Sequence, residues 1–452
     1  MKKNMFRLLI LQLVIFLLAG ISYAQTIIPE TALQSYINNG DSTFHWKMVD
    51  KLKAHGVKAY RLVFTSQEWQ NIEWKHELVV IVPGRLKYKD ALLFITGGSM
   101  NKNGKPNLHG WDEGMTKALA EIAKHNRAVT AILWQVPNQP LYDNLTEDAL
   151  ISYTLHNYRN DGDYNWPLLF PMTKSAVRAM DVVQELTEKK CKRPVSDFLV
   201  AGASKRGWTT WLTGAADSRV KAIAPMVIDM LNMPVSMAYQ KEVWGDYSVQ
   251  IEDYIKLGIV QNLEDPKGME LVKMIDPYSY RDKLTMPKML FMGTNDEYWP
   301  VDAVKNYIDD IPGDNRIHYV ANAGHDLGNK KQALEALNAF FSTTLTGEAL
   351  PPCEYKLTED EGKIELNVTA APELLKDIIL WTSVSEDRDF RDEKWKSEKV
   401  EIGNQVEIRI DIEYPLSGFK AFYIDLEYKA PFGSDYTQST RMFVADTNRY
   451  LK

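Results

Sequence analysis

The residue of this sequence best suited to covalent chemistry is a serine between an apolar run and a helical pattern. Ser204 follows the run Phe198–Ala201, and a pattern typical of a helix comes after it. A nucleophilic serine at such a strand-to-helix turn has a strained backbone, and small neighbours let strand and helix approach closely. Gly202 meets that need, but the second glycine is Gly207, one place later than usual, because Arg206 occupies the expected position. The alternative interpretation is an ordinary turn whose serine caps the helix.

An acid and a histidine follow this serine in the chain order that α/β-hydrolases use. Asp296 comes at the end of one apolar run, and His325 follows another such run after Ala-Gly. An un-ionised hydroxyl is a weak nucleophile and needs a base with a pKa near 7, which imidazole supplies. The base in turn needs a carboxylate that holds its tautomer. We therefore predict Ser204 as nucleophile, His325 as general base and Asp296 as the orienting acid.

Other residues compete for two of these roles. Asp302 and Glu297 lie close to Asp296 in the sequence and are alternatives for the acid. A lone histidine is more often structural than catalytic. His318 lies inside an apolar run, which favours packing. His325 differs because it follows a strand end in the right order.

The oxyanion formed during attack on a carbonyl requires hydrogen-bond donors. The backbone N–H of Lys205, at the start of the predicted helix, is one expected donor. The second is expected in the loop after another apolar run, where Gly97 and Gly98 stand, although these glycines also suit a plain turn. The side chains of Lys205 and Arg206 are either both solvated on the helix surface, or one of them faces the pocket and attracts a carboxylate-bearing substrate.

The elements that position these residues alternate between strands and helices. Between them lie helical patterns such as Met172–Glu188, in which apolar residues recur at threes. This rhythm predicts a mostly parallel, doubly wound sheet of the α/β class. The expected strands are Ala59–Thr65, Leu78–Val82, Ala91–Thr96, Val129–Trp134, Phe198–Ala201, Val220–Val227, Lys288–Gly293 and Ile317–Val320.

Two folded domains are predicted along the chain. Residues 25–350 form the α/β-hydrolase domain, and residues 229–286 within it read as a helical lid or as an extra helical layer without a gating role. Leu350-Pro351-Pro352 ends the alternation, because paired prolines stop regular elements. Residues 351–452 then show short strand-like runs that predict a small β-sandwich. This tail either packs against the core or docks on glycan or the cell envelope.

The first 24 residues predict a secretory signal peptide. Lys2, Lys3 and Arg7 precede an apolar run that is shorter than the roughly 20 residues of a membrane-spanning helix, and small residues end at Ala24. Cleavage there moves the formal net charge from −7 to −10, which disfavours nucleic acid as a partner and leaves no membrane anchor. The uncleaved segment as an anchor is the alternative.

The two cysteines and the predicted chemistry call for no cofactor. Cys191 and Cys353 lie in different predicted domains, so a disulfide and two free thiols are both open. No Cys/His spacing suggests a metal site. Acyl transfer through Ser204 requires neither a metal nor an organic cofactor.

These residues together resemble the PhoPQ-activated pathogenicity-related protein family. The resemblance covers about residues 28–345 and implies an α/β-hydrolase fold, a secreted or periplasmic location and a link to envelope stress or virulence. Some relatives are similar to dipeptidyl peptidases, which implies peptide substrates, and the serine turn resembles that of glucuronoyl esterases, which implies a sugar-acid ester. The resemblance to the PhoPQ-activated pathogenicity-related protein family is found in the stretches Phe64–Trp69, Gln135–Pro140, Trp166–Asp181, Gly202–Trp211 and Gly293–Pro300.

The expected function is therefore hydrolysis of an ester or a peptide bond through an acyl-serine intermediate, with a small molecule or a peptide as substrate. The triad alone does not separate the two bonds, since both pass through the same oxyanion. The alternative is a catalytically silent binding protein on a hydrolase scaffold, because fold does not fix function.

Overall fold

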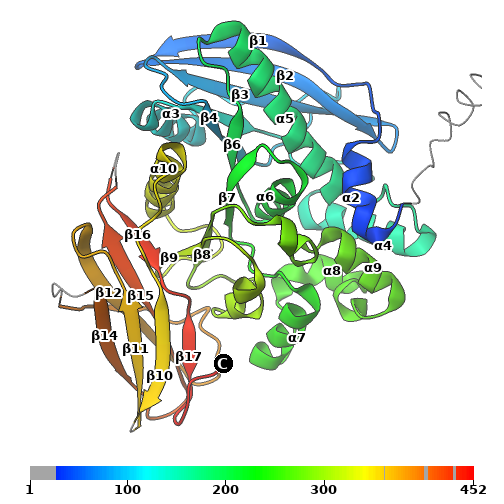
Figure 1. Cartoon of the computed structure of the whole chain (residues 1–452). Coiled ribbons are helices and arrows are strands. Elements are labelled where there is room, and N and C mark those ends of the chain that lie inside the picture. Colours follow the sequence, from blue (N-terminus) through cyan, green and yellow to red (C-terminus); the bar gives the residue numbers. More distant parts are fainter. Residues whose placement is uncertain (1–26, 361, 402–405, 431–433) are drawn as a thin grey trace, which may run out of the picture.

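The computed structural model describes residues 27–360, 362–401, 406–430 and 434–452 (Figure 1). The predicted signal peptide, residues 1–24, lies outside these ranges. Within them, no helix is long and apolar enough to cross a membrane. Fourteen strands join in one sheet, and three more form a second sheet.

Eight neighbouring strands build the centre of the large sheet in the order β2-β3-β5-β4-β6-β7-β8-β9. β3 runs antiparallel to both of its neighbours, and the strands from β5 to β9 run parallel. This is the sheet of an α/β-hydrolase, and each predicted strand overlaps one of the eight. Their bounds are β2 Val57–Trp69, β3 Ile72–Pro83, β4 Asp90–Ile95, β5 Val129–Leu133, β6 Asp197–Ala203, β7 Val220–Met226, β8 Lys288–Gly293 and β9 Asn315–Val320.

Helices cover both faces of this centre, so the strands are buried on both sides and read as unbroken apolar runs. The side chains of β4, β6, β7 and β8 alternate between two apolar clusters. α3 and α10 cover one face, and α5 and α6 cover the other (Figure 1). The helices of the two layers are α2 Pro29–Ile37, α3 Gly114–Asn126, α4 Glu147–Asp161, α5 Leu169–Lys190, α6 Lys205–Ala216 and α10 Lys331–Thr346.

A helical segment separates β7 from β8, where the sequence predicted a lid. It contains no strand, and its helices α7, α8 and α9 lie below α6 in the view of Figure 1. Six of its apolar side chains line a cavity together with Ser204. The helices are α7 Met233–Trp244, η1 Val249–Ile251, α8 Glu252–Lys256, η2 Val260–Asn262, α9 Pro266–Ile275 and η3 Pro277–Lys283, and η4 Ala303–Asn306 and η5 Ile308–Asp310 follow β8.

The C-terminal strands form two layers, as a β-sandwich does. β10, β11 and β14 make the three-stranded sheet, and their apolar faces meet those of β12 and β15. The second layer is no separate sheet, because β16 pairs antiparallel with β9 at Ser439 and Ile317. The bounds are β10 Tyr355–Asp360, β11 Lys363–Thr369, β12 Leu375–Ser385, β13 Lys396–Lys399, β14 Glu407–Glu413, β15 Phe419–Tyr428, β16 Tyr436–Ser439 and β17 Phe443–Ala445.

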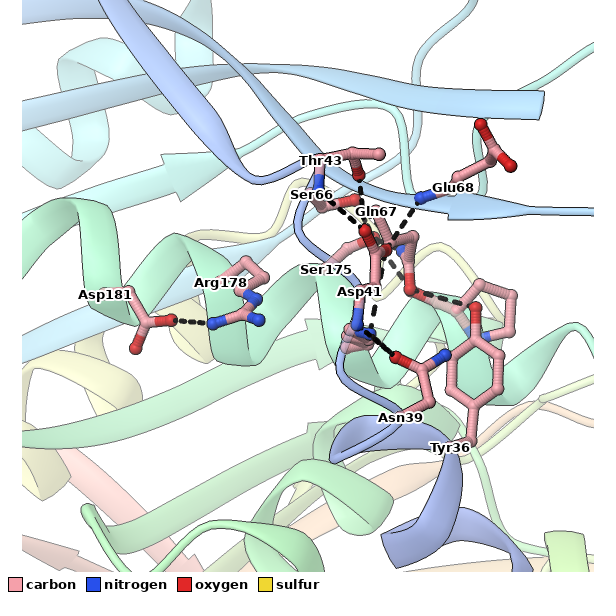
Figure 2. A network of polar contacts seen from close by, with 12 residues as sticks. Tyr36, Asn39, Asp41, Thr43, Ser66, Gln67, Glu68, Ser175, Arg178 and Asp181 are labelled. Atoms are coloured by element: carbon pink, nitrogen blue, oxygen red, sulfur yellow. Dashed lines mark hydrogen bonds and ion pairs between the residues drawn. The ribbon is translucent and has the colours of Figure 1, made fainter. Parts of the chain in front are cut away.

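The N-terminal edge carries a strand that the sequence did not predict. β1 (His45–Ala54) pairs with β2, and most of its side chains are exposed. A buried polar network fixes the segment between α2 and β1 (Figure 2). Asp41 accepts hydrogen bonds from the amides of Thr43 and Glu68, each at 2.8 Å. The Tyr36 hydroxyl donates to Gln67, whose amide donates in turn to Ser175 of α5. The network therefore joins three elements beneath the edge of the sheet.

Candidate active site

Ser204 occupies the sharp turn between β6 and α6. Its φ of +57° lies in a region that side-chain-bearing residues rarely adopt, and its amide donates to the Met226 carbonyl at 2.8 Å. The turn requires its flanking glycines. A Cβ on Gly202 would approach the Arg206 carbonyl oxygen to 2.7 Å, and one on Gly207 would approach that of Met226 to 2.7 Å. The second glycine is therefore needed one position later than in the usual pattern.

The structure brings the three predicted residues together. His325 Nε2 lies 2.9 Å from the Ser204 hydroxyl oxygen. Its Nδ1 lies 2.9 Å and 3.1 Å from the two carboxylate oxygens of Asp296. Because a carboxylate only accepts hydrogen bonds, Nδ1 carries the proton and Nε2 is left to accept from the serine hydroxyl.

The surroundings hold this acid and this base in place. Burial raises the pKa of Asp296, while the His325 ring and the Tyr298 amide act in the opposite direction. The Tyr298 amide donates to Asp296 at 2.8 Å, and the Tyr298 ring packs against the imidazole with centroids 4.0 Å apart. Glu297 accepts a hydrogen bond from the backbone amide of His325 at 3.0 Å. Three consecutive residues after β8 thus contact the histidine.

The rival residues contact other groups. Asp302 accepts from the Tyr239 hydroxyl at 2.8 Å and pairs with Lys305 at 2.9 Å. His318 is buried within β9, where its Nδ1 lies 3.1 Å from the Thr437 carbonyl oxygen. Burial lowers the pKa of His318 to about 4, so it stays neutral as a packing residue.

The predicted oxyanion donors fall into two groups. The Lys205 amide belongs to the first turn of α6, where N–H groups have no partner within the helix. Gly97 and Gly98 pack against side chains. A Cβ on Gly97 would approach the Arg206 guanidinium to 2.6 Å, and one on Gly98 would approach the Gln135 amide nitrogen to 2.9 Å. This packing alone explains why both positions are glycine. Their role as oxyanion donors stays a prediction.

The two cations after Ser204 are matched by acids at the start of α4. Arg206 makes a bidentate pair with Glu147, both hydrogen bonds being 2.7 Å long. Lys205 lies 3.0 Å from Glu147 and 2.9 Å from Asp148. Burial alone would raise the pKa of Glu147, but Arg206 and Lys205 hold it at about 2. Neither cation is therefore left over to attract a carboxylate-bearing substrate.

Sequence reasoning missed Glu147 and Asp148. Acids in the first turn of a helix commonly serve the helix dipole, so their types carry no sign of a site. One structural signal is the φ of +52° at Glu147, a strained value held by hydrogen bonds with Gln139. Asp148 also accepts from the Tyr254 hydroxyl of α8 at 3.0 Å. The pair thus connects α4, α6 and the helical segment around Ser204.

A C-terminal loop supports the loops that carry the acid and the base. The side-chain amide of Asn295, next to Asp296, donates to the carbonyls of Phe390, Arg391 and Glu393 at 3.1, 3.0 and 2.7 Å. Asn322, three residues before His325, accepts from the Trp395 amide at 2.9 Å. The loop between β12 and β13 therefore contacts both of the loops that carry the predicted acid and base. Cys191 and Cys353 are free thiols.

The sheet order, the serine turn and the order of the three residues define the chain as an α/β-hydrolase by fold. Within that class it belongs to the PhoPQ-activated pathogenicity-related protein family, whose model matches residues 33–391. The chain is 30% identical over 431 residues to autocrine proliferation repressor protein A of Dictyostelium discoideum, covering 88% of this chain and 86% of that protein.

Solved structures similar to this chain include two acetyl xylan esterases. The enzyme from Paenibacillus sp. R4 has 13% sequence identity and a TM-score of 0.48, over 67% of this chain and 90% of that one. The enzyme from Thermoanaerobacterium sp. JW/SL YS485 has 15% identity and a TM-score of 0.45, over 66% and 89% of the two chains.

Proposed function

We propose that this protein is a serine hydrolase that cleaves an ester or a peptide bond through an acyl-Ser204 intermediate. The observation that carries the proposal is the chain of two 2.9 Å contacts from Ser204 through His325 to Asp296. Such an alignment serves a hydroxyl that must lose its proton while it attacks. The positive φ of Ser204, worth roughly 1–3 kcal/mol of strain, supports the same role, since strained residues gather at functional sites.

The reaction follows from these positions. Ser204 Oγ attacks the carbonyl carbon while its proton passes to His325 Nε2, and the oxyanion accepts from the Lys205 amide. The bond to the leaving group then breaks, and the imidazolium returns the proton to that group. Water, deprotonated by His325, attacks the acyl-serine and releases the acid and the free hydroxyl. Asp296 stabilises the imidazolium in both halves.

An activity-based probe tests this proposal against a catalytically silent binding protein. Purified full-length protein is incubated with a fluorophosphonate, and the modified residue is identified by mass spectrometry. We expect labelling of the wild type, none of Ser204→Ala, and undiminished labelling of Ser218→Ala, an exposed serine after α6. Absence of labelling in folded wild-type protein would favour the binding protein.

We further propose that residues 1–24 direct export and are removed. The support is the basic start, the short apolar run and the small residues that end at Ala24. Fractionation of producing cells and N-terminal sequencing of the mature protein test this. We expect Gln25 as the first residue of the exported form; a chain retained inside the cell with its original N-terminus would contradict the proposal.

A further inference from the structure

A small cavity lies against the proposed nucleophile. It has a volume of about 40 Å³, and Ser204, Lys205 and Trp208 form its wall on α6 and the serine turn. The rest of the wall comes from the helical segment between β7 and β8, through Met233, Met237 and other apolar side chains, and from Tyr298 and Trp299 after β8. This volume is far below the roughly 300–1,000 Å³ of a typical ligand pocket, so the cavity has room for a short chain only.

The position of the cavity decides which half of a substrate enters it. In acyl transfer the leaving group must face the general base, because it receives the proton from His325 Nε2. Among the residues that the structure describes, His325 does not line the cavity, whereas Ser204, Lys205 and Tyr298, whose ring packs against the imidazole, do. A substrate with its oxyanion at the Lys205 amide and its leaving group at His325 therefore has its acyl chain directed to the cavity.

The charges in the wall decide what kind of acyl chain fits. Among the described residues that line it, the only side chains of Asp, Glu, Lys, Arg or His are Lys205 and Asp148, which pair with each other at 2.9 Å. Asp148 is also satisfied by the Tyr254 hydroxyl, and Lys205 by Glu147. A charged acyl group would have to leave water for a site whose own charges are already matched, at a cost that nothing there offsets.

We propose that this cavity is the acyl pocket of the enzyme and that it selects short, uncharged, apolar acyl groups of about two to four carbon atoms. This inference rests on the proposed serine hydrolase function and adds its substrate class. Each methylene that fits should raise kcat/KM roughly three- to fourfold, because burying a CH₂ is favourable by that factor in an equilibrium constant. Longer chains would displace packed side chains and lose this gain.

The test is a chain-length series of 4-nitrophenyl esters, from acetate to octanoate, with full-length protein. We expect kcat/KM to rise toward butyrate and to fall at least tenfold by octanoate. Two polar substrates accompany the series, the uncharged hexuronic acid methyl ester and the cationic alanine 4-nitroanilide, and both are expected to react more slowly than butyrate. A flat profile, a preference for octanoate, or a polar substrate that reacts faster than butyrate would overturn the inference.

Two variants locate the effect in the cavity. Met237→Ala enlarges it and should move the optimum to longer chains, whereas Met269→Ala, an exposed methionine on α9, should leave the profile unchanged. If Met237→Ala does not fold, Val260→Phe, which fills the cavity, should suppress butyrate hydrolysis more than acetate hydrolysis.

The results distinguish a failure of the acyl pocket from a failure of the proposed serine hydrolase function. Fluorophosphonate labelling of Ser204 without hydrolysis of any short ester would overturn the acyl pocket and leave the nucleophile standing. Absence of both labelling and hydrolysis in folded protein would overturn both.

Discussion

The orientation of His325 depends on a single carboxylate. Asp296 contacts Nδ1 with both oxygens, while Glu297 reaches only the backbone amide of the same histidine. We predict that Asp296→Asn, which can donate to Nδ1 and so favours the wrong tautomer, lowers kcat by roughly 10³–10⁴-fold. Steady-state kinetics with the best ester measure this, and Asp282→Asn, an exposed acid, is the control. An unchanged kcat would show that another group orients the histidine.

A buried histidine away from the site makes the fold sensitive to acid. His76 donates from Nδ1 to the Trp134 carbonyl, and its Nε2 accepts at 3.0 Å from the hydroxyl of Ser66, which belongs to the network of Figure 2. Burial lowers its pKa from 6.5 to about 4. Between pH 6.5 and 4 this histidine therefore binds a proton in the unfolded chain but stays neutral in the folded chain. The free energy of unfolding falls as the pH falls through this window.

The corresponding prediction concerns His76→Gln. The pKa difference at His76 is worth roughly 3 kcal/mol between pH 7 and pH 4. Urea unfolding of wild type and variant at both pH values should show a smaller pH-dependent loss in the variant, whatever its stability at pH 7. An equal loss in both proteins would mean that other groups cause the acid sensitivity. His318, with a similarly lowered pKa, is expected to add to the effect in both.

Among the elements, the junction of β6 and α6 leaves no space at Gly207. A Cβ there would meet the Met226 carbonyl at 2.7 Å and the Ile228 side chain at 2.8 Å. We predict that Gly207→Ala destabilises the protein by about 1–3 kcal/mol and lowers kcat, because α6 must move away from β7 and carries Ser204 with it. Gly114→Ala, in the first turn of α3 with nothing within 4 Å of the new Cβ, is the matched control. Thermal unfolding and kinetics of both variants decide the prediction; equal stability would contradict it.

The central strands buried on both faces were predictable, and the polar edge strands β1 and β13 were not. The eight central strands read as apolar runs because helices cover them on both sides. β1 and β13 were not predicted because they are polar edge strands with mostly exposed side chains.

The residues of the candidate site show the same contrast between what the sequence reveals and what only the fold reveals. Ser204, Asp296 and His325 follow strand ends in a recognisable order, whereas Glu147 and Asp148 gain their place only through tertiary contacts with Lys205 and Arg206.

For the molecule as a whole, the C-terminal strands are attached at two places that matter to the site. β16 continues the main sheet beyond β9, and the loop after β12 holds Asn295 and Asn322. We predict that a chain ending at residue 350 is insoluble or inactive, because removal exposes the β9 edge and the apolar face of α10. Expression of this fragment, with solubility and ester hydrolysis as readouts, checks the prediction. A soluble, active fragment would instead assign the tail a docking role.

The pairing of β16 with β9 also means that β9 is synthesised long before the strand that covers its edge. At translation rates of roughly 5–20 residues per second, the ribosome needs about 6–24 s after β9 before it has made its partner strand. A chain that still lacks β16 exposes the hydrogen-bonding edge of β9, and an open strand edge of this kind can pair with another chain and promote aggregation.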